Sequence, residues 1–179
     1  MFKRCLASAA VAGTVAAIAW AAADTGWRDV LDTPALKSPL AQRTLVNGLA
    51  RSGERLVAVG QRGHVLLSDD QGKSWRQAEV PVSSDLVAVA FPSADQGWAV
   101  GHDGVVLRSS DAGATWTRVL DGRQAGALMV EHYKREAANA GDAARAAALL
   151  KEAERFAAQG AENPFLDVAF EDAKTGYLA

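Results

Sequence analysis

The chain has 179 residues, of which 49% are apolar and 22% charged, so it carries enough apolar material for a folded core and is not typical of a disordered protein. Its formal net charge is −2, and it has no basic stripe with interleaved aromatic residues, which excludes nucleic acid as an expected partner. Length alone predicts one domain or slightly more.

Residues 1–23 form the predicted signal peptide. Lys3 and Arg4 make a basic start, residues 6–19 are uncharged and mostly apolar, and three alanines at 21–23 offer a small-residue cleavage site. We expect a signal-peptide helix that is cut after Ala23, and therefore a periplasmic or secreted protein. The alternative is an uncleaved N-terminal membrane anchor, although the apolar run is short for spanning about 30 Å of hydrocarbon.

Residues 24–45 form a predicted extended lead-in arm. This segment carries Pro34 and Pro39 and shows no sustained periodicity of either the helix or the strand type. We therefore expect this segment to be extended.

Residues 46–122 contain a short sequence motif, or phrase, that occurs twice. Ser68–Trp75 reads SDDQGKSW, and Ser109–Trp116 repeats it as SSDAGATW after 41 residues. Before each phrase, an apolar strand ends at Gly60 or Gly101, and a tight turn leads to a second apolar strand. Short strands with a period of about 40 residues favour four-stranded propeller blades. We predict two Asp-box propeller blades.

The repeated phrase, Ser-x-Asp-x-Gly-x-Ser/Thr-Trp, is the Asp-box or BNR repeat, and its chemistry is that of a turn. An Asp carboxylate accepts hydrogen bonds from backbone N–H groups that follow it, glycine supplies a positive φ, and tryptophan packs on a neighbouring strand or blade. We predict structural Asp-box roles for eight residues: Ser68, Asp70, Gly72, Trp75, Ser109, Asp111, Gly113 and Trp116.

Residues 123–160 form a predicted helical hairpin insert, because they are rich in Ala, Glu, Arg, Lys and Leu. Gly141 is the expected C-cap of the first helix and Asp142 the N-cap of the second. The second helix places apolar residues at i, i+3, i+4 and i+7 from Ala146 to Ala157. We expect an antiparallel hairpin set between blades.

Residues 161–179 form the predicted start of a third blade. Val168–Ala179 matches Val89–Val100, so about 38 residues are inserted relative to the repeat, and the sequence stops in mid-repeat. The predicted fold is thus all-β, a partial β-propeller of two blades plus the start of a third with an inserted α-helical hairpin. We expect the third blade to be truncated and the chain to be an N-terminal fragment.

The sequence predicts no catalytic residue, no cofactor and no metal site. Cys5 is the only cysteine and lies in the signal peptide, so the mature chain would have no thiol chemistry. His64 and His102 follow glycines in neighbouring repeats, and two solvated turn histidines are a better interpretation than a metal pair. No H-E-x-x-H motif and no P-loop occur, and the only tyrosines are Tyr133 and Tyr177.

The amino-acid sequence of the predicted blades resembles the photosystem II stability/assembly-factor-like family of BNR propellers. The resemblance rests on Val-Ala-Phe, Gly-Trp-Ala-Val-Gly-x-x-Gly and Leu-Arg-Ser-Ser-Asp-x-Gly-x-Thr-Trp, within 45–119 and 163–179. Glu154–Phe165 resembles a non-photosynthetic bacterial branch of that family, whose proteins are exported. The resemblance implies a propeller of about seven blades and a scaffold that assembles a membrane complex through protein contacts.

We expect an exported, non-catalytic propeller scaffold that binds a membrane-associated protein partner, as an assembly or accessory factor for a membrane complex or transporter. No small-molecule ligand is identifiable. The alternative is an exported sialidase-like glycoside hydrolase, whose catalytic residues would lie in missing C-terminal blades. A third expectation is self-association, in which several copies complete one ring, because an isolated pair of blades leaves long edges exposed.

Overall fold

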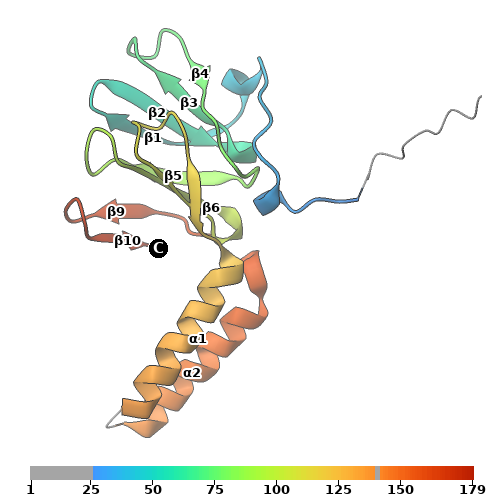
Figure 1. Cartoon of the computed structure of the whole chain (residues 1–179), viewed down its shortest axis with the longest axis vertical. Coiled ribbons are helices and arrows are strands. Elements are labelled where there is room, and N and C mark those ends of the chain that lie inside the picture. Colours follow the sequence, from blue (N-terminus) through green and yellow to red (C-terminus); the bar gives the residue numbers. More distant parts are fainter. Residues whose placement is uncertain (1–25, 140–141) are drawn as a thin grey trace, which may run out of the picture.

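The computed structural model describes residues 26–139 and 142–179 and consists of antiparallel sheets with two helices projecting from them (Figure 1). This architecture confirms the predicted all-β partial propeller with an inserted helical hairpin. The predicted signal-peptide helix and the Gly141 C-cap lie outside the described residues. No helix within the described ranges is both long and apolar enough to cross a membrane.

Blade 1 is a four-stranded sheet in the order β1-β2-β3-β4, and blade 2 repeats it as β5-β6-β7-β8. The blade 1 strands are β1 (Val46–Ser52), β2 (Arg55–Gly60), β3 (Val65–Ser68) and β4 (Arg76–Gln77). The blade 2 strands are β5 (Leu86–Ala90), β6 (Gly97–Gly101), β7 (Val106–Ser109) and β8 (Thr117–Leu120). Blade 3 is the two-stranded sheet of β9 (Val168–Phe170) and β10 (Gly176–Leu178).

The same register recurs in both complete blades. Leu49 in β1 lies opposite Ala58, and Val89 in β5 lies opposite Ala99. Both first strands also carry an irregularity near their start, between Val46 and Gly48 and between Leu86 and Ala88. Two sheets that share pairing and irregularity place equivalent residues on equivalent faces, so the repeat in sequence becomes a repeat in space.

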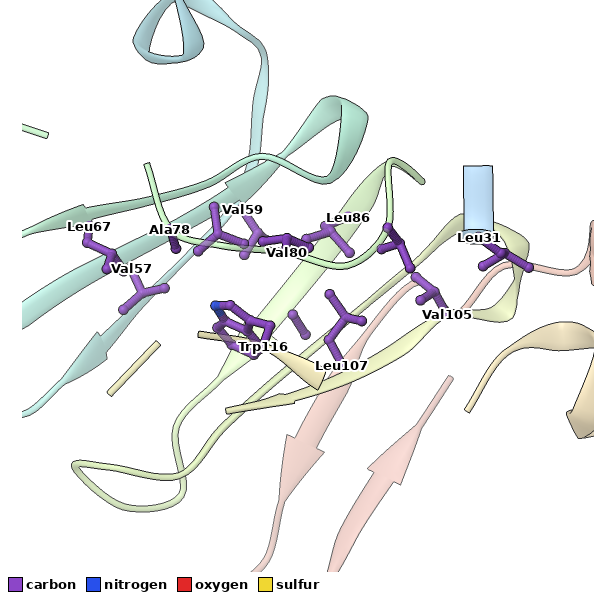
Figure 2. Packing of buried hydrophobic residues seen from close by; sticks show 13 residues of the cluster. Leu31, Val57, Val59, Leu67, Ala78, Val80, Leu86, Val105, Leu107 and Trp116 are labelled. Carbon is purple, nitrogen blue, oxygen red and sulfur yellow. The ribbon is translucent and has the colours of Figure 1, made fainter. Parts of the chain in front are cut away.

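The main core lies between blades 1 and 2. Val57, Val59 and Leu67 from blade 1 face Leu107 and Trp116 from blade 2 (Figure 2). Alternation of side chains along a strand sends one set of residues to each face of a blade. Blade 2 therefore has a second, smaller core on its other face, where Val100 and Val106 pack against Val168 of blade 3.

The lead-in arm is more structured than the sequence predicts. It contains two 3-10 turns, η1 (Val30–Asp32) and η2 (Ala41–Arg43), and Leu31 is only 2% exposed within the main core. The Asp29 carboxylate caps η1 by accepting a hydrogen bond from the Leu31 N–H at 2.9 Å. Buried Leu31 and Ala41 thus anchor a segment that has no periodic pattern.

The hairpin consists of α1 (Gly122–Asn139) and α2 (Ala143–Ala158), which pack along each other and project away from the sheets (Figure 1). Asp142 caps α2 as predicted, because its carboxylate accepts a hydrogen bond from the Arg145 N–H at 3.0 Å. A further 3-10 turn, η5 (Gly160–Glu162), leads into blade 3.

Candidate interaction surface

The two Asp-boxes form the β3–β4 and β7–β8 turns and have the same hydrogen bonds. In the first box the Asp70 carboxylate accepts from Ser68 Oγ at 2.8 Å, from Ser74 N–H at 2.9 Å and from Ser74 Oγ at 2.6 Å. The Gly72 N–H donates to Ser68 Oγ at 2.7 Å, and the Trp75 indole donates to the Gly72 carbonyl at 3.1 Å. The Asp70 carboxylate is therefore a hydrogen-bond acceptor for its own turn.

The second box repeats this set with Asp111 as acceptor. Ser109 Oγ donates at 2.8 Å, Thr115 N–H at 2.9 Å and Thr115 Oγ1 at 2.6 Å, and the Trp116 indole donates to the Gly113 carbonyl at 2.9 Å. Burial raises the pKa of Asp111, but the hydrogen bonds from Thr115 and Ser109 outweigh it and leave the pKa below its usual value. The carboxyl is thus held ionised as a hydrogen-bond acceptor.

The two tryptophans of the boxes differ in their surroundings. Trp116 is 4% exposed between blades 1 and 2 and meets Phe91 edge to face, with ring centroids 6.2 Å apart. Trp75 is only half-buried and packs on Ala58 and Leu66, on the face of blade 1 that points away from blade 2.

The two turn histidines also differ, and the expectation that both are solvated is wrong for His64. That side chain is 6% exposed, with Nε2 3.2 Å from the Leu36 carbonyl and Nδ1 3.3 Å from Thr44 Oγ1. His102 is exposed. In the part of the chain that the structure describes, no three His, Cys, Asp or Glu side chains form a group that could hold a metal ion.

An ion cluster, which the sequence does not predict, holds the root of the hairpin. Arg123 contacts Asp32 of the lead-in arm through both terminal nitrogens, at 2.9 and 3.1 Å, and Asp121 at 2.9 Å. Arg118 in β8 pairs with the same two carboxylates at 3.3 and 3.4 Å and donates to the Leu31 carbonyl. The cluster joins the lead-in arm, blade 2 and α1.

The charges in this cluster shift each other's pKa. Hydrogen bonds from Arg123 lower the pKa of Asp32 to about 2, with Arg118 adding to the effect. Burial raises the pKa of Asp121, which is 1% exposed, but Arg123 and Arg118 outweigh burial and lower it overall. The Asp121 position just before a helical segment is a sequence signal for an N-terminal cap. Asp32, the other carboxylate that Arg123 contacts, lies too far along the chain for any local pattern to reveal it.

Close backbone contacts complete the hairpin root. Gly104 adopts a φ of +62°, and a Cβ there would lie 2.7 Å from the Gly122 Cα at the start of α1. A Cβ on Gly122 would in turn lie 2.6 Å from the Ala161 Cα. The two ends of the insert therefore meet where it leaves blade 2.

A shallow groove runs between β8 and α1 beside this root, and we call it the hairpin groove. Its volume is about 530 Å³. It is lined by Val119, Leu120, Arg123, Gln124, Ala127, Leu128 and Glu131. Leu128 is 60% exposed, and Val119 is also exposed on the outermost strand of blade 2. An exposed apolar groove next to a free strand edge is the type of surface that binds a protein segment.

Comparison with known proteins gives a family match and partial structural matches. The family model described as "Photosynthesis system II assembly factor YCF48" matches residues 28–110 and 52–130, which together cover more than half of the chain. The search of curated proteins finds no match.

Three solved structures are similar to part of the chain. A structure described as YCF48 bound to D1 peptide is 18% identical, with a TM-score of 0.40 over 43% of this chain and 26% of that one. YCF48 from Cyanidioschyzon merolae is 29% identical, with a TM-score of 0.39 over 43% and 27%. An ancestral GH74 enzyme is 19% identical, with a TM-score of 0.36 over 42% and 13%. The matched part thus spans about a quarter of the length of the two YCF48 structures.

Proposed function

Since the chain belongs to the family of the photosynthesis system II assembly factor YCF48, we propose that it is an exported, non-catalytic propeller scaffold that binds a membrane-associated protein. An assembly factor acts by contact with other proteins, and family membership supports this general role. The membrane complex or transporter that the chain serves belongs to the same proposal.

The hairpin groove is the observation that carries the proposal. It combines exposed apolar side chains, Val119 and Leu128, with an open edge strand. The ion cluster around Arg123 fixes α1 against blade 2, so the groove is held in shape before a partner arrives. A preformed apolar groove loses less conformational freedom on binding than a flexible one.

The Asp-box geometry supports a non-catalytic role. Asp70 and Asp111 each accept three hydrogen bonds from their own turn, which commits most of the acceptor sites of each carboxylate to the turn. A catalytic carboxyl is expected instead to lie in a cleft, within reach of a reacting group.

The first test deletes the hairpin and, with it, the hairpin groove. Joining Gly122 directly to Ala161 deletes the hairpin with little strain, because these residues already lie side by side. We expect cross-linking in an envelope extract to trap a partner with the wild type, and to lose it with this deletion and with Leu128→Arg. Ala148→Arg on the exposed side of α2 is the matched control, because it introduces the same charge outside the groove. Identical capture by all four proteins would contradict the proposal.

Export is tested separately. N-terminal sequencing of the protein recovered from the periplasm or medium should begin at Asp24. A protein that stays in the membrane fraction and retains Met1 would indicate the uncleaved anchor instead.

The sialidase-like alternative has one observation in its favour. The Tyr177 hydroxyl donates to Glu171 at 3.1 Å, which is a tyrosine–carboxylate pair of the type such enzymes use. Both side chains are exposed, however, and an exposed phenol lacks the desolvated surroundings that activate a nucleophile. Turnover of a sialoside that is lost in Tyr177→Phe would assign this pair a catalytic role, and absence of turnover by the wild type would remove the pair as a candidate.

A further inference from the structure

The lead-in arm is bound to the blades around η1. The Leu31 side chain belongs to the main core (Figure 2). The Val30 carbonyl accepts a hydrogen bond from the Ser83 N–H at 2.9 Å, and the Ala35 N–H donates to the Val80 carbonyl at 3.0 Å. The arm is therefore attached to the segment between β4 and β5 through its backbone, and to the core through a buried side chain.

The hairpin is attached to the sheets at its root. There α1 packs on η5 and on a further 3-10 turn, η4 (His102–Gly104), and the close backbone contacts of Gly104 and Ala161 both involve Gly122. Contacts that meet at one point leave the angle of the hairpin to the side chains around that point. α1 has 18 residues, so it is about 27 Å long, and a rotation of about 10° at the root would move its far end by about 5 Å.

Asp32 links the arm to this root. Arg123 directly follows Gly122, and its guanidinium has two carboxylate partners. Asp121 lies two residues before Arg123, so that pair stays within the root. Asp32 comes from the arm and contacts both terminal nitrogens of Arg123, at 2.9 and 3.1 Å. A bidentate pair fixes direction as well as distance. The position of η1 therefore bears directly on the first turn of α1.

We propose that the lead-in arm is a latch for the hairpin. While η1 is docked on the blades, Asp32 holds the angle of the hairpin through Arg123, and displacement of the arm releases it. Because α1 and β8 form the two walls of the hairpin groove, the same displacement changes the width of the groove. Coupling between two sites is reciprocal, so loosening the hairpin also loosens the arm. This inference goes beyond the proposed function, and its tests need no partner.

Asp32→Ala removes the link and leaves the other attachments of the arm in place. The Leu31 side chain stays in the core, and Arg118 still donates to the Leu31 carbonyl. Asp32→Asn keeps the size of the side chain and removes only its charge. The matched control is Asp69→Ala, because Asp69 also pairs with two arginines and its side chain is 55% exposed, against 51% for Asp32. Both arginine partners of Asp69 belong to blade 1, away from the hairpin.

Distances between two spin labels measure the angle of the hairpin. The full chain with Cys5→Ser receives labels at Lys73→Cys, in the first Asp-box turn, and at Ala148→Cys on α2, which are both exposed positions. Double electron–electron resonance should give one narrow distance distribution for this background and for Asp69→Ala. The distribution should broaden in Asp32→Ala and in Asp32→Asn. An unchanged distribution in both Asp32 variants, or equal broadening in Asp69→Ala, would overturn the proposal.

Amide hydrogen exchange tests the reciprocal effect. Arg123→Ala changes the hairpin root, and it should speed exchange at the Ala35 and Ser83 amides, whose hydrogen bonds attach the arm. We expect an increase of about two- to fivefold, the range of an exposed ion pair. Arg155→Ala, which removes an ion pair with Glu152 inside α2, should leave both rates unchanged. If Arg123→Ala also leaves both rates unchanged, the arm and the hairpin are not coupled and the proposal is wrong.

Discussion

The Asp carboxylate of each Asp-box replaces hydrogen bonds that a tight turn cannot make with its own backbone. The residue before the glycine also adopts a left-handed conformation, with φ of 62° at Gln71 and 59° at Ala112. Such residues carry a conformational cost that local hydrogen bonds must offset. The repeated phrase therefore stabilises a turn that contains a left-handed residue, and its Asp is needed for the hydrogen bonds of that turn.

The pH dependence of the first box follows from this geometry. Hydrogen bonds from Ser74, followed by that from Ser68, lower the pKa of Asp70 from 3.8 to about 2. A lowered pKa means that the stabilisation is complete above about pH 4 and is lost as the pH falls toward 2. Ser74→Ala should raise the pKa of Asp70 in an NMR titration of the carboxyl carbon. Lys73→Ala, which keeps its backbone N–H, should leave that pKa near 2.

At the scale of elements, the hairpin depends on close approach between its helices. A Cβ on Gly126 of α1 would lie 2.6 Å from the Ala157 Cα in α2, and a contact this short with backbone cannot be relieved by a side-chain rotation. Ala146 and Ala153 are buried at the same interface. Small residues thus set the distance between the two helices.

Gly126→Ala separates two opposing effects. Helix propensity alone would stabilise α1 by about 1 kcal/mol, whereas the close contact forces the helices apart. We expect the contact to dominate, so thermal unfolding followed by circular dichroism should show a lower melting temperature. Ala127→Gly, at an exposed neighbouring position, should lower it by the propensity effect alone. A higher melting temperature for Gly126→Ala would contradict the described helix packing.

At the scale of the whole molecule, the same sequence motif has different neighbours in each blade. Trp116 lies in the interface between blades 1 and 2, whereas Trp75 lies on the face of blade 1 that points away from blade 2. Equal motifs therefore contribute unequally to stability, because burial depends on the next blade and not on the motif.

Replacing the two tryptophans measures this difference. Trp116→Ala should lower the free energy of unfolding by about 3–5 kcal/mol, since it leaves a cavity between two blades. Trp75→Ala should cost about 1–2 kcal/mol, because part of its surface is already in water. Chemical denaturation of the wild type and of each variant gives the two costs. Equal costs for the two variants would show that blade 1 is covered as completely as blade 2.

Much of the fold could be predicted because its signals are local. The eight Asp-box positions, the four-stranded repeat and the Asp142 cap each depend on residues within a few positions of one another. The buried state of Leu31 and His64 could not be predicted in this way, because their partners lie on other elements. A segment without periodicity gives no sign that one of its side chains reaches the core.

The sequence by itself determined the blades, the turns that separate them and the helical insert, because periodicity, glycine and capping residues act over short distances. Only the tertiary structure decided which faces are covered and which stay open. Arg123 pairs with Asp32 only after the chain has folded, because the lead-in arm and α1 are far apart in sequence. Trp75 and Trp116 differ in burial because different residues pack against them. Contacts between distant residues depend on how whole elements pack, which no short segment specifies.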